Sequence, residues 1–420
     1  MSPLRVCIDA RRAGEGVAGG VEQMMIGLAE GLSSLRDGDE EYYFLTSPSD
    51  PDWIAPYLSG ACRVLVGERA SSLPSWRARL QTIAPLRSAW EAVSPLIGTS
   101  TIPIAVSDGT IERARIDVIH FPSQNAFLTD VPSIYQPHDL QHRHLPQHFS
   151  RRTRLARDVT YRAFCDKADT VVMMSAWGQR DIVSAFELPA EKVRVVPGAS
   201  VLTAYPEPGA DDLRRTALAY SLPDAFAFYP AQTFPHKNHL ALLDALALLR
   251  DEQALVVPLV SSGMKNDHYA AIERRVRDLR LDEQVRFVGF VSPVELRALY
   301  RLARCMVFPS TFEGWGLPMV EAFQEGLPVA CSDATSLPEV AGGAALLFSP
   351  HDPRAIAHGV RQIWVDDALR ARLVERGRAR AEELTWVRSA ARFRALYREI
   401  GVRVLPRLAL STPVHANAER

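Results

Sequence analysis

The chain has 420 residues, too many for one typical hydrophobic core, and this length predicts two domains of about 200 residues each. Its 47% hydrophobic and 23% charged residues are those of an ordinary globular protein. The formal net charge of −1 argues against a nucleic-acid partner held by bulk charge.

The cysteines and the apolar runs indicate where the protein works. The five cysteines form no CxxC pair, which is typical of buried thiols in a reducing compartment and predicts no metal site made of them. The N-terminus lacks the apolar core of a signal peptide, and no run of about twenty apolar residues occurs. We therefore expect a cytoplasmic protein.

Short apolar runs alternate with helical patterns along the first half of the chain. This alternation is typical of parallel α/β sheets. The strands that it predicts lie at 5–8, 42–45, 63–66, 118–121, 133–135, 170–173 and 193–196. The stretch 197–210 contains Pro and Gly and is predicted to be a linker.

A glycine pair, Gly19 and Gly20, separates the first strand from an amphipathic helix. Such a pair lets a loop approach a phosphate or an acceptor closely, although glycine turns are common in any fold. Further on, Asp50-Pro51-Asp52 has the spacing of a metal-binding DxD motif. Its place in a loop of the first domain favours an ordinary turn instead.

The region from about 70 to 115 combines basic and aromatic residues. A solvated helical insertion that packs on the first domain is one interpretation of it. A peripheral contact with an anionic membrane surface, near a lipid-linked acceptor, is the other. The residues concerned are Trp76, Arg77, Arg79, Leu80, Leu86, Arg87 and Trp90.

Several histidines follow, and His138 comes directly after the strand at 133–135. The carboxyl end of a strand is where open α/β sheets place their active groups. Four other histidines are near it in the sequence, and spacing does not choose among them: His120, His142, His144 and His148. A metal site is disfavoured because no carboxylate or thiolate set accompanies the imidazoles.

The second half repeats the α/β pattern, with strands predicted at 226–229, 255–260, 285–288, 306–308 and 328–330. Two consecutive doubly wound sheets create a cleft between domains, where ligands of such folds usually bind. Lys237 follows the first of these strands and could neutralise a diphosphate as a mobile point charge.

Residues 308–323 predict a strand, a tight loop and a helix that starts near Pro318, because proline suits the first helical turn. The amides of Gly316 and Leu317 would then bind phosphate at the positive end of the helix. Glu313 precedes the helix and Glu321 lies one turn inside it. Carboxylates accept hydrogen bonds, so these two suit sugar hydroxyls at either end of a diphosphate.

The segment 313–322, EGWGLPMVEA, resembles the EGxGLPxxEA signature of the retaining glycosyltransferases of family 4, which have the GT-B fold. The resemblance implies an α/β protein of two Rossmann-like domains with a cleft between them. It also implies that Glu313 contacts the donor sugar and that Glu321 contacts the nucleotide ribose.

Weaker similarities extend over most of the chain. The glycine pair resembles a GGxE element, which implies that Gly19 and Gly20 lie near the donor. Residues 136–140, QPHDL, are similar to the HDL segment whose histidine faces the donor sugar, and this favours His138. PHKN resembles the PxKN element, so Lys237 becomes the pyrophosphate clamp, and GFVS resembles a GxVS loop that places Phe290 near the base.

One departure from the family concerns the position six residues before the lysine, where many members carry Arg and this chain carries Ala231. Either His236 replaces part of that charge or the helix-end amides bind more of the phosphate.

The final helix, about 386–400, carries an apolar stripe that is sufficient for simple core packing. In the family this helix crosses back onto the first domain. The resemblance implies an acceptor-side domain at 1–205, completed by that helix, and a nucleotide-sugar-binding domain at 210–385.

The function that the resemblance implies is metal-independent transfer of a hexose, with retention, to a glycan or lipid-linked acceptor in surface polysaccharide synthesis. GDP-mannose is the first donor to test, and UDP-hexoses are the alternative. A sugar-nucleotide epimerase and a non-catalytic scaffold are rival classes.

Overall fold

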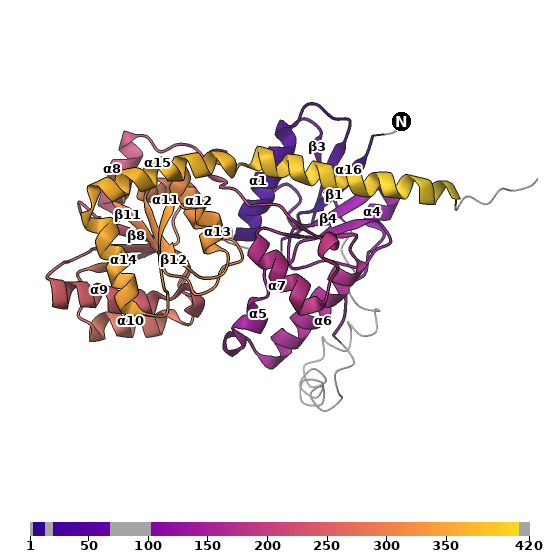
Figure 1. Ribbon diagram of the computed structural model, residues 1–420. Helices are drawn as coiled ribbons and strands as arrows, with labels where there is room; N and C mark the ends of the chain where they lie inside the picture. The colour runs from indigo at the N-terminus through magenta and orange to yellow at the C-terminus, as the bar shows by residue number, and fades with distance from the viewer. Residues whose placement is uncertain (1–2, 13–19, 68–101, 411–420) are drawn as a thin grey trace, which may run out of the picture.

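The structure is a computed structural model and describes residues 3–12, 20–67 and 102–410, with side chains up to 402. Two α/β domains lie side by side, and each is built around its own parallel sheet (Figure 1). This is the α/β architecture that the sequence predicts.

The N-terminal domain contains a seven-stranded, wholly parallel sheet in the order β3-β2-β1-β4-β5-β6-β7. The strand order reverses between β1 and β4, so loops at this switch point border a crevice at the carboxyl ends of the strands. The strands are β1 (Arg5–Asp9), β2 (Glu41–Thr46), β3 (Cys62–Val66), β4 (Val118–Phe121), β5 (Ser133–Tyr135), β6 (Thr170–Met173) and β7 (Val193–Val195).

The C-terminal domain contains a six-stranded parallel sheet in the order β10-β9-β8-β11-β12-β13. Its order reverses between β8 and β11, which gives a second crevice facing the first. The strands are β8 (Ala227–Pro230), β9 (Leu259–Ser262), β10 (Val285–Gly289), β11 (Cys305–Phe308), β12 (Val329–Ser332) and β13 (Ala345–Phe348).

Two details of this sheet differ from the predicted strands. The strand predicted at 255–260 begins only at Leu259, because Ala254 turns the chain with φ 51° and the N–H of Leu255 donates back to Leu249 O. The edge strand β13 was not predicted. It is short and partly exposed, and this gives a weak hydrophobic signal.

Helices cover both faces of each sheet, and within the described residues none is long and apolar enough to cross a bilayer. Those of the first domain are α1 (Gly20–Ser34), α4 (Thr110–Arg113), α5 (Gln141–His144), α6 (Arg151–Lys167) and α7 (Ala176–Phe186). Those of the second are α8 (Ala210–Ala219), α9 (His239–Gln253), α10 (Tyr269–Asp278), α11 (Pro293–Leu302), α12 (Leu317–Gln324), α13 (Leu337–Ala341), α14 (Pro353–Val365) and α15 (Asp367–Glu383).

The last helix, α16 (Trp386–Leu410), runs from the second domain across the first (Figure 1). It packs on α1, where Gly27 and Gly31 leave room for Trp386. A Cβ atom at Gly27 would lie 1.9 Å from Trp386 Nε1, and one at Gly31 would lie 2.6 Å from the Trp386 carbonyl oxygen. The helix is longer than the predicted 386–400, and it ties the end of the chain to the first domain.

Candidate active site

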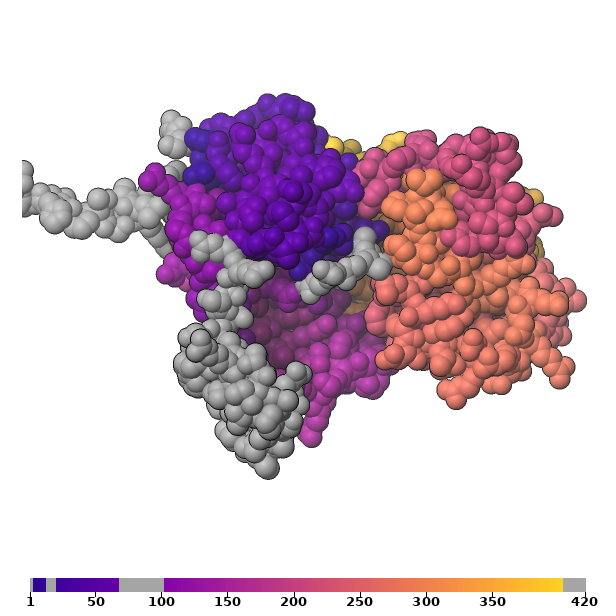
Figure 2. All heavy atoms as spheres, turned by 180° about the vertical axis from the view of Figure 1, so that it is seen from behind, coloured from indigo at the N-terminus to yellow at the C-terminus, as the bar shows by residue number. Residues whose placement is uncertain are grey.

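A cavity of about 470 Å³ lies where the two crevices meet, lined by residues of both domains. Seen from behind, the indigo and magenta N-terminal domain adjoins the orange C-terminal domain along this boundary (Figure 2). All the predicted site residues that the structure describes line the cavity: Gly20, His138, Lys237, Phe290, Glu313, Gly316, Leu317 and Glu321. Gly19, the ninth, lies outside the described residues.

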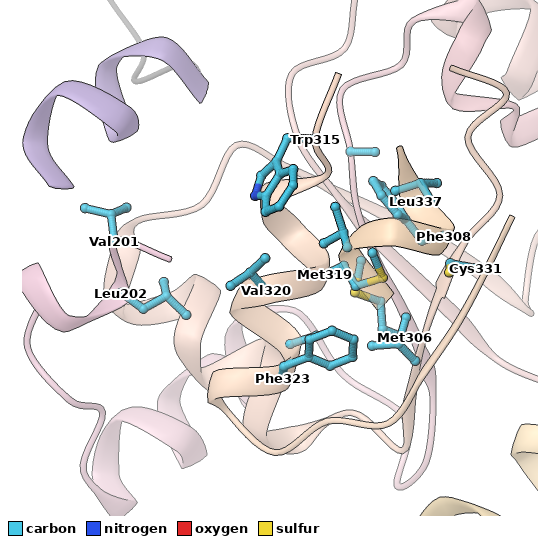
Figure 3. Close-up of a cluster of buried hydrophobic side chains, with 14 of the residues drawn as sticks. Val201, Leu202, Met306, Phe308, Trp315, Met319, Val320, Phe323, Cys331 and Leu337 are labelled. Carbon is cyan, nitrogen blue, oxygen red and sulfur yellow. The ribbon is translucent and has the colours of Figure 1, made fainter. Parts of the chain in front are cut away.

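The helix α12 points its N-terminus at the cavity. Gly316 caps it with φ 101°, a conformation that side chains disfavour, and Pro318 occupies the first turn. Met319, Val320 and Phe323 anchor the helix in the core beside β11 and β12 (Figure 3). The free amides at this rigid, electropositive end can bind an anion such as a phosphate.

Lys237 and Glu313 form an ion pair inside the cavity, with Nζ 2.6 Å from Oε1. Lys237 belongs to the 3₁₀ turn η5 (Pro235–Lys237), and Glu313 lies in the loop between β11 and α12. The Glu313 backbone is fixed because Thr335 Oγ1 and Ser336 Oγ each donate to its carbonyl oxygen at 2.9 Å. The site thus presents one cation for a phosphate and one carboxylate for hydroxyl groups.

Glu321 is buried one turn inside α12, where it accepts a hydrogen bond of 2.7 Å from the hydroxyl of Tyr300. Burial raises the pKa of Glu321 to about 7, although the bond from Tyr300 works in the opposite direction. This carboxyl group can therefore both donate and accept hydrogen bonds near neutral pH. No local sequence pattern marks Tyr300 as a site residue.

His138 stands at the end of the loop after β5, with the left-handed backbone φ of 71° that non-glycine residues seldom adopt. Its Nε2 lies 3.0 Å from the carbonyl oxygen of Pro122. Because a carbonyl only accepts, Nε2 carries the proton and Nδ1 is the acceptor of the neutral ring. Burial lowers the pKa of His138 to about 4, so the ring is neutral at neutral pH.

Three of the four neighbouring histidines have partners outside this cavity. Nδ1 of His120 lies 2.8 Å from the hydroxyl of Tyr397, a residue of α16. Nε2 of His142 lies 3.0 Å from Asp158 Oδ1, and Nε2 of His144 lies 2.8 Å from Asp181 Oδ1. Of the five, His138 alone lines this cavity.

Ala231, the position where the resemblance implies an arginine, lines the cavity, and so does His236. Burial, reinforced by the nearby Lys237, lowers the pKa of His236 to about 4. The imidazole is thus neutral at neutral pH and can donate one hydrogen bond without adding positive charge. Lys237 and the α12 amides are therefore better candidates than the neutral His236 for binding a diphosphate.

The two domains touch beside the site, in contacts that the sequence did not indicate. A Cβ atom at Gly314 would lie 2.9 Å from the His138 carbonyl oxygen, so glycine is what permits this approach. The Glu339 carboxylate of α13 accepts hydrogen bonds from the amides of Ala176, at 2.8 Å, and Trp177, at 3.1 Å. No local pattern marks Glu339, because its partners belong to the other domain.

Other predicted features lie outside the cavity or outside the described residues. Asp50 ends a turn in which its N–H donates to Ser47 O at 3.0 Å, and it forms an ion pair with Arg12. The basic and aromatic residues from Trp76 to Trp90, interpreted either as a helical insertion or as a membrane contact, fall in the undescribed segment 68–101.

Two family models match successive parts of the chain. Glycosyltransferase Family 4 covers residues 18–199, and Glycosyl transferases group 1 covers residues 214–380. Each model coincides with one of the two α/β domains.

Curated relatives from Escherichia coli match about half of the chain. It is 32% identical to O-antigen chain mannosyltransferase B, over 53% of this chain and 58% of that protein. It is 30% identical to the serotype-specific mannosyltransferase WbdA, over 54% of this chain and 28% of that protein. The chain therefore matches less than two thirds of the length of these relatives.

Solved structures match nearly the whole chain at low identity. HepE from Anabaena, solved with UDP and glucose, has a TM-score of 0.65 at 18% identity and covers 97% of this chain and 99% of its own. Sucrose-phosphate synthase from Thermosynechococcus elongatus has a TM-score of 0.66 at 20% identity, and the match covers 95% of this chain and 100% of that chain. At these identities the likeness concerns the fold alone.

Proposed function

The chain belongs to glycosyltransferase family 4 and has the GT-B fold, and from this premise we propose that it transfers a hexose from a nucleotide diphosphate donor to an acceptor hydroxyl. The observation that carries the proposal is the cavity of about 470 Å³ between the domains. It brings together His138, Lys237, Glu313 and the N-terminus of α12, from three separate loops. One cation, one helix N-terminus and the carboxyl groups of Glu313 and Glu321 suit a sugar nucleotide.

Each group has a role in this proposal. Lys237 and the amides of Gly316 and Leu317 stabilise the departing diphosphate, as fixed donors aimed where charge develops. Glu313 binds donor-sugar hydroxyls, and Glu321 binds the ribose. His138 faces the sugar near the reacting carbon.

The reaction proceeds with retention and without a required metal ion. The departing phosphate helps to deprotonate the acceptor on the same face of the sugar. Closure of the domains excludes water and so limits hydrolysis of the donor.

The donor that we propose is GDP-mannose, because two matching relatives are named as mannosyltransferases. A UDP-hexose is the second candidate, since HepE was solved with UDP. Thermal stabilisation by GDP, UDP, ADP and their sugar conjugates, without added metal, tests both. A ligand present at about 100 times its Kd adds about 2.7 kcal/mol of stability, which shifts Tm by several degrees.

A selective shift with GDP or GDP-mannose supports the mannosyltransferase, and a selective UDP shift keeps the family but changes the donor. The absence of any nucleotide shift would favour the scaffold. Product analysis with the preferred donor then separates a transferase from an epimerase, because an epimerase changes the donor without an acceptor.

For the acceptor we propose a glycan or a lipid-linked glycan of a surface polysaccharide. The support is the name of one relative as an O-antigen chain enzyme.

A further inference from the structure

A second cavity, of about 530 Å³, adjoins the first between the two domains. Phe312 lines both. The residues before and after it in the sequence line different cavities, because Thr311 lines the second and Glu313 the first. Likewise, His236 and Lys237 line the first cavity, whereas Pro235 and Asn238 line the second. The two cavities therefore adjoin each other at Phe312.

The second cavity is polar. No Asp, Glu, Lys or Arg is among the described residues that line it. Instead it has two large aromatic rings, four imidazoles and neutral hydrogen-bonding groups. The rings and imidazoles are those of Trp177, Phe312, His144, His148, His268 and His351.

The aromatic part is a fixed platform. The rings of Trp177 and Phe312 meet edge to face, with centroids 5.6 Å apart and planes at 83°. The ring of His144 packs on both, at 5.6 Å and 5.3 Å, and Asp181 holds it through a 2.8 Å contact. The buried ring of Phe312 thus holds the partly exposed ring of Trp177 at a constant position.

The remaining imidazoles are available to a ligand. The side chains of His148, His268 and His351 make no hydrogen bond in the portion of the chain with described side chains. Each neutral imidazole offers one donor and one acceptor, which is the pairing that a hydroxyl group requires.

We propose that this second cavity binds the neutral saccharide chain of the acceptor, beyond the hydroxyl that receives the hexose. Sugar rings have apolar faces for Trp177 and hydroxyl groups for the imidazoles. A diphosphate would favour Lys or Arg, which the described lining lacks, and a lipid would leave the imidazoles unpaired. This inference rests on the proposed transferase function, whose acceptor it specifies.

Direct binding without a donor tests the inference separately from that function. Saturation-transfer NMR with neutral trisaccharides of mannose, glucose and galactose should give a signal from at least one, and Trp177→Ala should lose it. Trp364→Ala is the matched control, because Trp364 lies on α14 and lines neither cavity. His351→Ala should weaken the same signal. Because His351 is exposed, this substitution should cost little stability.

Kinetics supply the second measurement. Trp177→Ala should raise the KM for the bound trisaccharide about tenfold, the effect of losing one aromatic contact, and raise the KM of the matching monosaccharide much less. The absence of signal from all three sugars with the wild-type protein would overturn the inference, as would an undiminished signal from both variants. A nucleotide shift without saccharide binding would leave the transferase proposal standing and refute only this one.

Discussion

At the residue scale, a bound donor must disrupt the ion pair between Lys237 and Glu313. Their 2.6 Å contact neutralises both charges, and a diphosphate would compete with Glu313 for the ammonium group. We expect Glu313→Ala to lower the transfer rate by about 10²- to 10³-fold, while GDP or UDP still raises Tm because Lys237 is free to bind it. Lys237→Ala should lose both the transfer activity and the rise in Tm with GDP or UDP.

Glu252→Ala is the matched control for this pair, since it breaks an exposed ion pair with Arg354 outside both cavities. Its transfer rate should equal that of the wild type. Full activity in Glu313→Ala would show that the carboxylate does not contact the reacting sugar.

Glu321 makes stability depend on pH. The folded protein holds its proton up to about pH 7, whereas an unfolded chain releases it near its ordinary pKa of about 4.3. The buried carboxyl group therefore stabilises the fold at low pH, and this contribution is lost as the pH rises through about 7. Its full size is on the order of 3 kcal/mol.

We expect Glu321→Gln to remove this dependence, because the amide keeps an oxygen for Tyr300 and does not ionise. Denaturation with urea should show the variant more stable than the wild type at about pH 8, and the difference should shrink towards about pH 5. A constant difference across this range would contradict the assigned titration. The exposed Glu252→Gln serves as the control.

At the element scale, α16 joins the two domains through its contact with α1. The side chain of Trp386 fills the space that Gly27 leaves, so any larger residue must displace the Trp386 ring. Gly27→Ala should destabilise the protein by about 1–3 kcal/mol through overpacking, measured by chemical denaturation. Gly20→Ala, on the same helix, is the control, since its Cβ would meet no atom closer than 3.8 Å. Equal stability of both variants would mean that the Trp386 ring moves aside freely.

At the scale of the whole molecule, the carboxylate of Glu339 holds the second domain against the N-terminus of α7 in the first. It accepts two backbone hydrogen bonds, and the positive end of the helix adds to the attraction. Glu339→Ala should loosen this contact, increase the radius of gyration in small-angle scattering and slow transfer several-fold. Glu339→Gln should show a smaller effect, because one oxygen can still accept. Unchanged scattering and rate would show that other contacts set the domain arrangement.

Several elements followed directly from short stretches of sequence. The strands β4 and β5 have the predicted bounds, and the strand, loop and helix around Pro318 form as expected. Apolar runs and a proline in a first helical turn act locally, so their effect is visible in the sequence. The edge strand β13 and the true start of β9 were missed, because pairing with a neighbouring strand decides them.

The sequence by itself determined the α/β architecture and the family, since both depend on hydrophobic periodicity and on one dense local motif. Only the tertiary structure decided which distant groups meet. It placed Tyr300 against Glu321, the carboxylate of Glu339 on α7, and Trp177 beside Phe312. Each of these contacts joins residues from separate elements, two of them from separate domains, and their proximity arises only when the sheets and helices pack.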